Sequence, residues 1–278
     1  MERAIVLGGG GVTGIGWEVG VLAGLRDGGL EVGAADLVIG TSAGAFVGAL
    51  LAGGADLTAA ATRVAGDGTS PDLPSVDFGL VAQAFGIMSD RSIPAGTART
   101  RVGALAREAE MGDPAAFVAW FAERLPLTDW PPALRVTAVD AVSGQPVTWD
   151  AGSGVDLVTA VAASCAVPCV FPPVPVDGVP FMDGGVRSVT NADLAAGAAA
   201  VIVLAPVVGV FRGSPTAELA ALGDARHALV APDADARAAM GANVFDESRR
   251  GASVAAGRVQ GAASAAALKA VWDVGGAG

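Results

Sequence analysis

Short apolar runs that end in glycine recur along the chain, and segments with helical spacing follow them. Residues 4–7 form an uninterrupted apolar run before four consecutive glycines, and residues 17–25 then carry apolar side chains at helical intervals. The run at 37–39 also stops at a glycine, and a helix-forming segment follows it at 45–51. Continuous apolar runs bounded by glycine are typical of buried parallel strands. The pattern therefore predicts two strand–loop–helix units at the start of the chain.

The segment from residue 66 to residue 125 has the pattern of a loop, an apolar cover and two helices. Residues 66–79 have the composition of an exposed loop, and residues 80–93 are apolar without a clear period, so we expect them to form an irregular cover. Residues 99–111 and 113–125 have helical patterns, the second capped by Asp113 with a proline in its first turn. We expect these two helices to pack on a face of the sheet.

The second half of the chain adds antiparallel strands to this pattern. Residues 134–150 alternate about a Ser143-Gly144 turn, and Asp177-Gly178 indicates a second hairpin. The remaining elements that the pattern predicts are strands at 201–204 and 227–230, a short helix at 216–222 and an alanine-rich helix at 253–272. No break in composition divides the chain, so we predict one mixed α/β domain that spans residues 1–278.

Composition and charge exclude several classes of function. The chain has 52% hydrophobic and 16% charged residues, which predicts a compact core, and its net charge of −11 disfavours nucleic acids and anionic membrane surfaces. Two cysteines and one histidine among 278 residues offer neither a disulfide framework nor a metal cluster. We therefore expect no cofactor and no metal. The oligomeric state cannot be read from these features.

The chain carries no pattern of a secretory signal or of a membrane-spanning helix. The apolar run after Met1 is too short for a secretory signal, and four prolines interrupt the uncharged stretch at 157–176. We therefore expect a cytoplasmic protein with at most peripheral membrane contact.

The segment Gly40-Thr41-Ser42-Ala43-Gly44 matches the GxSxG pattern of a nucleophile elbow. In such an elbow Gly40 and Gly44 permit a tight turn that exposes the serine hydroxyl above the sheet. A predicted strand precedes the motif and a predicted helix follows it, as the elbow requires. The N–H group of Ala43 would lie at the start of that helix. The alternative is a plain glycine turn, but the context favours Ser42 as a nucleophile.

The four glycines after the first strand indicate a loop whose N–H groups converge on negative charge. They also fit the GxGxxG dinucleotide pattern, but neither Glu31 nor Asp36 lies at the ribose-binding end of the second strand. A Walker loop fails too, because the required lysine is missing. An oxyanion hole formed by Gly9, Gly10 and Gly11, together with Ala43, is the functional prediction. A close-packed turn that binds nothing is the alternative.

Asp183 lies in an Asp-Gly-Gly turn after a short apolar run, where its carboxylate could serve as the base that an activated serine requires. His227 is the single histidine, and a Ser42, Asp183 and His227 triad would have the chain order of the α/β-hydrolases. His227, however, stands at the entry of a predicted strand rather than on a loop after the last one. We therefore expect it to be structural.

The glycine-rich loop, the GxSxG serine and the Asp-Gly-Gly aspartate together resemble the patatin-like phospholipase family in order and spacing. The resemblance extends to the segments between the motifs, at 134–144, 163–168 and 171–174. It implies a three-layer α/β/α sandwich with a mostly parallel central sheet and added β-hairpins. It also implies a Ser–Asp dyad without histidine, carried here by Ser42 and Asp183. The chain departs from the family at Thr13, where the oxyanion loop often carries Arg or Lys.

The family resemblance implies a serine lipid acyl hydrolase that cleaves carboxylic esters of phospholipids or lysolipids through an acyl-enzyme. An acyltransferase with the same dyad, and a non-catalytic nucleotide- or lipid-binding protein that uses the glycine loop, remain as alternatives. The net charge and Thr13 lean toward neutral or lysolipid esters. The candidates for contacts with the acyl chain are Trp17, Phe85, Ile87 and Met88. The alternative is that these residues only belong to the hydrophobic core.

Overall fold

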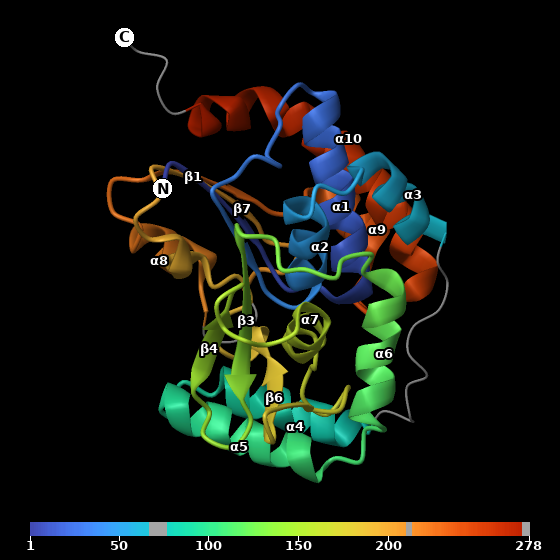
Figure 1. The fold of residues 1–278 in the computed structure, drawn as a ribbon, viewed down its shortest axis with the longest axis vertical. Helices are drawn as coiled ribbons and strands as arrows, with labels where there is room; N and C mark the ends of the chain where they lie inside the picture. Colours follow the sequence, from blue (N-terminus) through green and yellow to red (C-terminus); the bar gives the residue numbers. More distant parts are fainter. Residues whose placement is uncertain (67–76, 210–212, 274–278) are drawn as a thin grey trace.

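A mostly parallel sheet forms the centre of the computed structural model, which describes residues 1–66, 77–209 and 213–273 (Figure 1). Its parallel strands are β3 (Leu134–Asp140), β2 (Leu37–Gly40), β1 (Arg3–Leu7), β7 (Ala200–Leu204) and β8 (Arg226–Val230), in this spatial order. The antiparallel strands are β4 (Pro146–Trp149), β5 (Val174–Val176) and β6 (Val179–Asp183). The short apolar runs of the sequence thus become the buried strands, because both of their faces are covered.

Strands β2 and β6 meet end to end along one edge of β3. Strand β4 occupies the opposite edge, pairing Val136 with Trp149 and Ala138 with Val147. On the shared edge, Gly40 of β2 pairs with Val136, and Asp183 of β6 pairs with Ala138. Because β2 runs parallel and β6 antiparallel to β3, their carboxyl ends point toward each other. This register brings the residue after β2 close to the last residue of β6.

One face of the sheet is covered by the larger group of helices: α1 (Gly11–Asp27), α2 (Ala43–Ala52), α3 (Leu57–Gly66), α6 (Pro114–Arg124), α7 (Leu157–Ser164), α9 (Ala234–Met240) and α10 (Arg250–Trp272). Helices α1 and α10 lie side by side (Figure 1). A Cβ atom at Gly24 of α1 would lie 2.1 Å from the carbonyl oxygen of Arg258, and one at Gly261 of α10 would lie 2.2 Å from that of Val21. The two backbones can approach this closely only because glycines face each other.

The other face is covered by fewer elements: α8 (Pro215–Ala220), the 3-10 turn Ala192–Ala195, α4 (Phe78–Ser89) and α5 (Ala95–Glu108). The turn and α8 pack on the alternate side chains of β1 and β2, such as Val6 and Ile39. Helices α4 and α5 lie together across the end of the molecule where β3 ends and β6 begins (Figure 1). They contact Val139 and Met182 there. The architecture is therefore an α/β/α sandwich.

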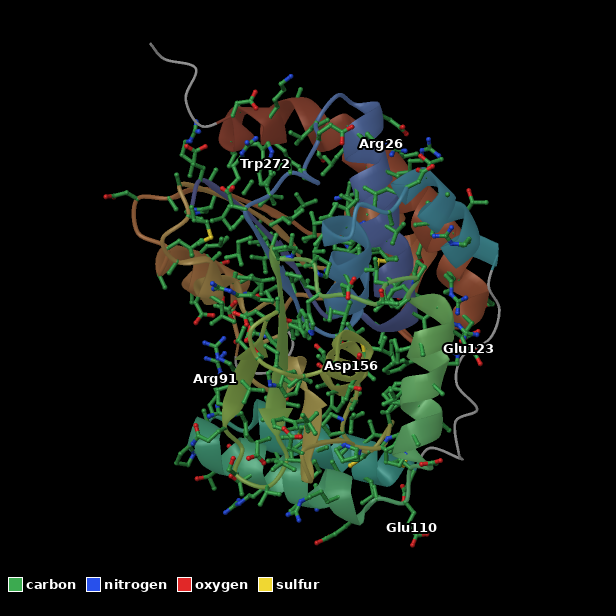
Figure 2. All side chains as sticks on the ribbon, viewed as in Figure 1. Arg26, Arg91, Glu110, Glu123, Asp156 and Trp272 are labelled. Carbon is green, nitrogen blue, oxygen red and sulfur yellow. The ribbon has the colours of Figure 1, made fainter. Side chains whose placement is uncertain are left out.

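Several charged side chains lie at the periphery of the molecule. Figure 2 shows Arg26, Arg91, Glu110 and Glu123 at its outer edges, around an interior filled by carbon. Trp272, by contrast, is buried at the end of α10. Within the described ranges, no helix is both long enough and apolar enough to cross a bilayer.

The structure confirms most of the elements that the sequence predicts. Both hairpins form, as β3–β4 and β5–β6, and the predicted strands and helices of the second half appear with ends shifted by a few residues. The prediction for residues 80–93 is wrong: residues 78–89 form a regular helix, whose N–H groups Asp77 caps at Gly79 and Leu80. The predicted loop at 66–79 falls largely outside the described residues. Assignment of residues 1–278 to one domain stays a prediction.

Candidate active site

Ser42 occupies a strained turn between β2 and α2. Its backbone has φ 55° and ψ −122°, a conformation that non-glycine residues rarely adopt. Its N–H donates to the Ser164 hydroxyl at 2.9 Å. A Cβ at Gly40 would lie 2.5 Å from the Cα of Ala45, and one at Gly44 would lie 2.1 Å from the carbonyl oxygen of Leu7. Both glycines of the GxSxG motif are therefore needed for close approach, which is the geometry of a nucleophile elbow.

The glycine-rich loop follows β1 and packs against this turn. The N–H of Gly9 donates to the carbonyl of Val189 at 2.8 Å, so it is not available to an oxyanion. The N–H groups of Gly10, Gly11 and Ala43 have no acceptor within the described parts of the chain. Gly11 has a φ of 59°, where an L side chain would be strained. Of the four predicted oxyanion donors, the amides of Gly10, Gly11 and Ala43 therefore remain as candidates.

Asp183 is the last residue of β6 and is almost fully buried. Its Oδ1 accepts the N–H of Gly185 at 2.7 Å, and its Oδ2 has no hydrogen-bond partner among the described residues. Burial raises the pKa of Asp183 to about 7, and the nearby Ser42 hydroxyl and the Gly185 N–H offset part of this shift. The Ser42 hydroxyl is thus close to the carboxyl group, although not in regular hydrogen-bond geometry. The two predicted catalytic side chains are brought together by the meeting ends of β2 and β6.

A buried polar network links the elbow to the turn after Asp183. Asn191 is in the left-handed conformation, with φ 54°, and its Nδ2 donates to the Thr41 hydroxyl at 3.0 Å and to the Ser188 carbonyl at 2.7 Å. The Thr41 hydroxyl also lies 2.9 Å from that of Thr137 on β3. Sequence reasoning missed these residues, because single polar side chains 54 to 150 positions apart carry no local pattern.

An apolar cavity of about 330 Å³ opens above Ser42 and Asp183. Helix α4 lines it with Phe85 and Met88, and α5 lines it with Val102. Two of the four predicted acyl-chain contacts, Phe85 and Met88, therefore lie at this cavity. An apolar cavity with a few polar groups at its base is the usual form of a site for a small molecule or a lipid chain.

The other candidate residues lie away from this cavity. Trp17 is fully buried and donates its indole N–H to Gln260 at 2.9 Å, so it belongs to the α1–α10 packing, and Ile87 is absent from the cavity lining. His227 is exposed on the edge strand β8, beside Val201 of β7, and is thus three strands away from β2. Thr13 is fully buried in α1.

The fold and the site together define an α/β sandwich with a serine elbow beside a buried carboxyl group. The family model for patatin-like phospholipase matches residues 5–196, which include the glycine loop, Ser42 and Asp183. The chain belongs to this family, and membership supports lipid acyl hydrolase activity in general. No curated protein shows significant sequence similarity to the chain.

Two solved structures resemble the chain over nearly its whole length. The crystal structure of VipD from Legionella pneumophila is 13% identical with a TM-score of 0.48, and the match covers 96% of this chain and 67% of VipD. The crystal structure of the type III effector protein ExoU is 16% identical with a TM-score of 0.43, and the match covers 96% of this chain and 53% of ExoU. The chain thus spans about half the length of ExoU.

Proposed function

We propose that the protein is a serine lipid acyl hydrolase that cleaves carboxylic esters through an acyl-enzyme, with Ser42 as the nucleophile and Asp183 as the base. The observation that carries the proposal is the pairing of a strained elbow, whose serine lines the apolar cavity, with a buried carboxyl group whose pKa is raised to about 7. A base is most useful when its pKa lies near the working pH. Family membership supports the same class of reaction.

In the proposed first step, the Ser42 hydroxyl attacks the ester carbonyl while Asp183 accepts its proton. The negative charge that develops on the carbonyl oxygen would be bound by the N–H groups of Gly10, Gly11 and Ala43. Ala43 is the first residue of α2, so the helix dipole adds favourable potential at the same place. Asp183 then returns the proton to the leaving alcohol, and the acyl group stays on Ser42.

In the proposed second step, a water molecule replaces the alcohol. Asp183 takes a proton from this water as the water attacks the acyl-enzyme, and Ser42 leaves with a proton regained from Asp183. The apolar cavity lined by Phe85 and Met88 would hold the acyl chain during both steps. Its apolar lining also strengthens the electrostatic contacts, because little water competes with them.

Labelling with a fluorophosphonate, followed by mass spectrometry, tests the proposal. We expect the adduct on Ser42, no adduct on the Ser42→Ala variant, and normal labelling of a control variant at the exposed Ser153. Nitrophenyl esters of graded chain length then measure turnover. Retention of most of the turnover by Ser42→Ala would refute Ser42 as the nucleophile. Release of free fatty acid, rather than transfer of the acyl group to an added alcohol, separates hydrolysis from acyl transfer.

A further inference from the structure

A second cavity, of about 50 Å³, borders Ser42 on the side of α6. The apolar cavity of the candidate active site, called the acyl cavity below, lies toward α4 and α5. Ser42 and Gly11, one of the candidate oxyanion donors, line both cavities, and so do Val167 and Phe245. An ester with its carbonyl group at Ser42 therefore has two spaces around it, one for each half of the molecule.

Five aromatic side chains line the second cavity, which is called the aromatic cavity below. The chain has only nine phenylalanines, five tryptophans and no tyrosine, so more than a third of its aromatic residues gather at this small space. Three come from α6, one from the segment after α7 and one from the loop after α9: Phe117, Trp120, Phe121, Phe171 and Phe245. Among the described residues, the lining carries no charged side chain. The cavity therefore favours an apolar group over a polar one.

The aromatic rings hold one another in place. Phe117 stacks on Phe171, with ring centroids 4.7 Å apart and ring planes inclined by 27°. Edge-to-face contacts join Phe171 to Phe245 at 6.0 Å and Phe117 to Phe121 at 5.3 Å. Rings that contact each other in this way cannot move apart without losing these contacts. The cavity should therefore stay narrow and accept a flat or unbranched group in preference to a thick one.

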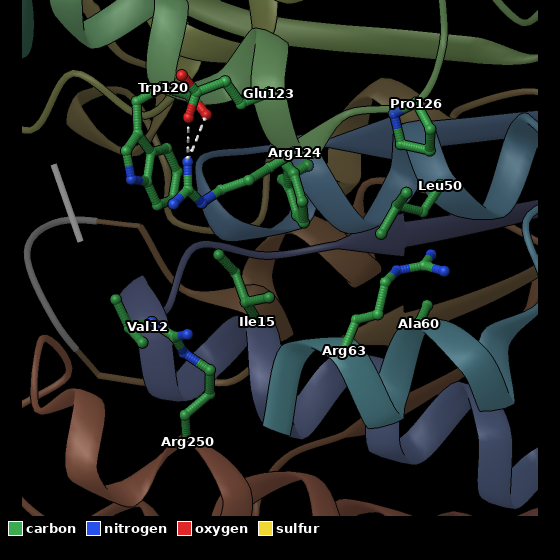
Figure 3. A pocket seen from close by; sticks show the side chains of 11 residues that line it. Val12, Ile15, Leu50, Ala60, Arg63, Trp120, Glu123, Arg124, Pro126 and Arg250 are labelled. Carbon is green, nitrogen blue, oxygen red and sulfur yellow. Dashed lines mark hydrogen bonds and ion pairs between the residues drawn. The ribbon is translucent and has the colours of Figure 1, made fainter. Parts of the chain in front are cut away.

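Packing of a hydrophobic core does not by itself account for this cavity. A cavity inside an apolar cluster lowers stability, because its lining atoms lose contacts that a close-packed interior would provide. This cavity lies beside the serine elbow, and Ala43, another candidate oxyanion donor, is part of its wall. It adjoins a larger cavity of about 370 Å³ that reaches α3, and Val12, Ile15 and Trp120 line both (Figure 3). A bound group can thus begin at the oxyanion donors and continue past the rings.

We propose that the aromatic cavity binds the alcohol half of the ester, and that it selects neutral esters whose alcohol is apolar and narrow next to the ester oxygen, such as benzyl or straight-chain alkyl esters. The inference rests on the proposed function, which places the acyl chain in the acyl cavity and the reacting carbonyl at Ser42. When the bond between the carbonyl carbon and the ester oxygen breaks, the alcohol takes the proton held by Asp183 and leaves through the aromatic cavity. A hydroxyl or charged group near the ester oxygen would lose its hydrogen bonds to water there.

The first comparison changes only the polarity of the alcohol. The 2-methylbutyl ester of octanoic acid and 1-octanoylglycerol have nearly the same shape, but the glycerol ester carries two free hydroxyl groups. We expect the kcat/KM of the wild-type protein to be at least about tenfold higher for the 2-methylbutyl ester, because an apolar lining leaves buried hydroxyl groups without partners. A preference for 1-octanoylglycerol would overturn the proposal.

The second comparison changes the thickness of the alcohol. Benzyl and cyclohexylmethyl octanoate are both esters of a primary alcohol with a six-membered ring, but only the benzyl ring is flat. We expect the wild-type kcat/KM to be about tenfold higher for the benzyl ester. Phe171→Ala should widen the aromatic cavity and lower this ratio at least about fivefold, mainly through faster cleavage of the cyclohexylmethyl ester. Phe171→Leu keeps a large side chain, so it should lower the ratio less and should fold even if the alanine variant does not.

Two control variants separate the two cavities. Phe85 lines the acyl cavity but not the aromatic cavity, so Phe85→Ala should alter the preference for acyl-chain length and keep the ratio of benzyl to cyclohexylmethyl cleavage. Phe78 is 80% exposed and lines neither cavity. Phe78→Ala should therefore change neither preference, which controls for the loss of an aromatic ring as such.

The outcomes distinguish this proposal from the proposed function. Equal kcat/KM values within each pair of esters, or an unchanged ratio in folded Phe171→Ala and Phe171→Leu, would overturn the alcohol site while Ser42 remains the nucleophile. If the wild-type protein hydrolyses none of the esters and a fluorophosphonate does not label Ser42, the proposed function itself fails.

Discussion

Replacing Asp183 by asparagine should stabilise the fold while it removes the activity. Burial raises the pKa of this carboxyl group to about 7 from an ordinary 3.8, a shift of about three units. One unit corresponds to about 1.4 kcal/mol, so holding the carboxylate in the folded protein costs about 4 kcal/mol above pH 7. Asparagine has nearly the same shape and carries no charge, and it should therefore escape this cost.

The free-energy cost of burying the Asp183 carboxylate changes with pH only within a limited range. Below pH 3.8 the carboxyl group keeps its proton in both states, and burial carries no titration penalty. Between pH 3.8 and about 7 the unfolded chain has lost the proton while the folded protein retains it, so stability falls as the pH rises. Above pH 7 both states are ionised and the penalty is constant. We therefore expect the advantage of Asp183→Asn over the wild-type protein to be about 2.5 kcal/mol larger at pH 8 than at pH 5.

Urea unfolding of both proteins at the two pH values measures this difference. Ser42→Ala is the control, because it is expected to be equally inactive but retains Asp183. Since the Ser42 hydroxyl lowers the pKa of Asp183, its removal should keep the direction of the pH dependence and not abolish it. Turnover should follow the same titration, since the base acts only when ionised: kcat/KM of the wild-type protein should fall about tenfold per pH unit below pH 7. An equal advantage of Asp183→Asn at pH 5 and pH 8 would refute the reasoning about burial.

Three other substitutions test separate parts of the structure. His227→Ala should keep turnover within a few-fold of the wild-type value. A large loss of turnover at an unchanged melting temperature would instead support a catalytic triad of Ser42, Asp183 and His227. Asn191→Ala removes the amide that bridges the nucleophile elbow and the turn after the base, so kcat should fall more than KM rises, and wild-type kcat would refute its positioning role. Gly24→Ala places a Cβ 2.1 Å from the carbonyl of Arg258 and should lower the free energy of unfolding by about 1–3 kcal/mol in urea unfolding. Gly86→Ala, where a Cβ meets nothing within 4 Å, is its control, and equal effects of the two would contradict the close packing of α1 on α10.

Local patterns predicted the strands, the hairpins and the elbow because each depends on neighbouring residues. The run at 37–39 and the glycines at 40 and 44 lie within eight positions, so the turn that presents Ser42 can be read directly from the sequence. The same holds for the hairpin turn at Ser143-Gly144, where Gly144 has a φ of 71°. Short-range backbone sterics determine these features, and the residues that satisfy them are adjacent.

The parts that the sequence did not reveal depend on contacts between distant elements. Helix α4 carries apolar residues on most of its surface, so its periodicity is weak, and it forms where Val139 and Met182 offer a surface to cover. The bridge from Asn191 to Thr41 joins residues 150 positions apart.

The position of Glu18 shows why burial alone does not identify a functional group. Its carboxyl group is fully buried in α1, neither oxygen has a partner within the described residues, and burial raises its pKa well above the ordinary value. Yet Glu18 does not line the apolar cavity above Ser42 and Asp183. Asp183 shares the burial and the raised pKa, but it also borders a cavity and lies beside a strained serine. Strain, an open cavity and a perturbed pKa point to chemistry only where they coincide, and at Asp183 they do.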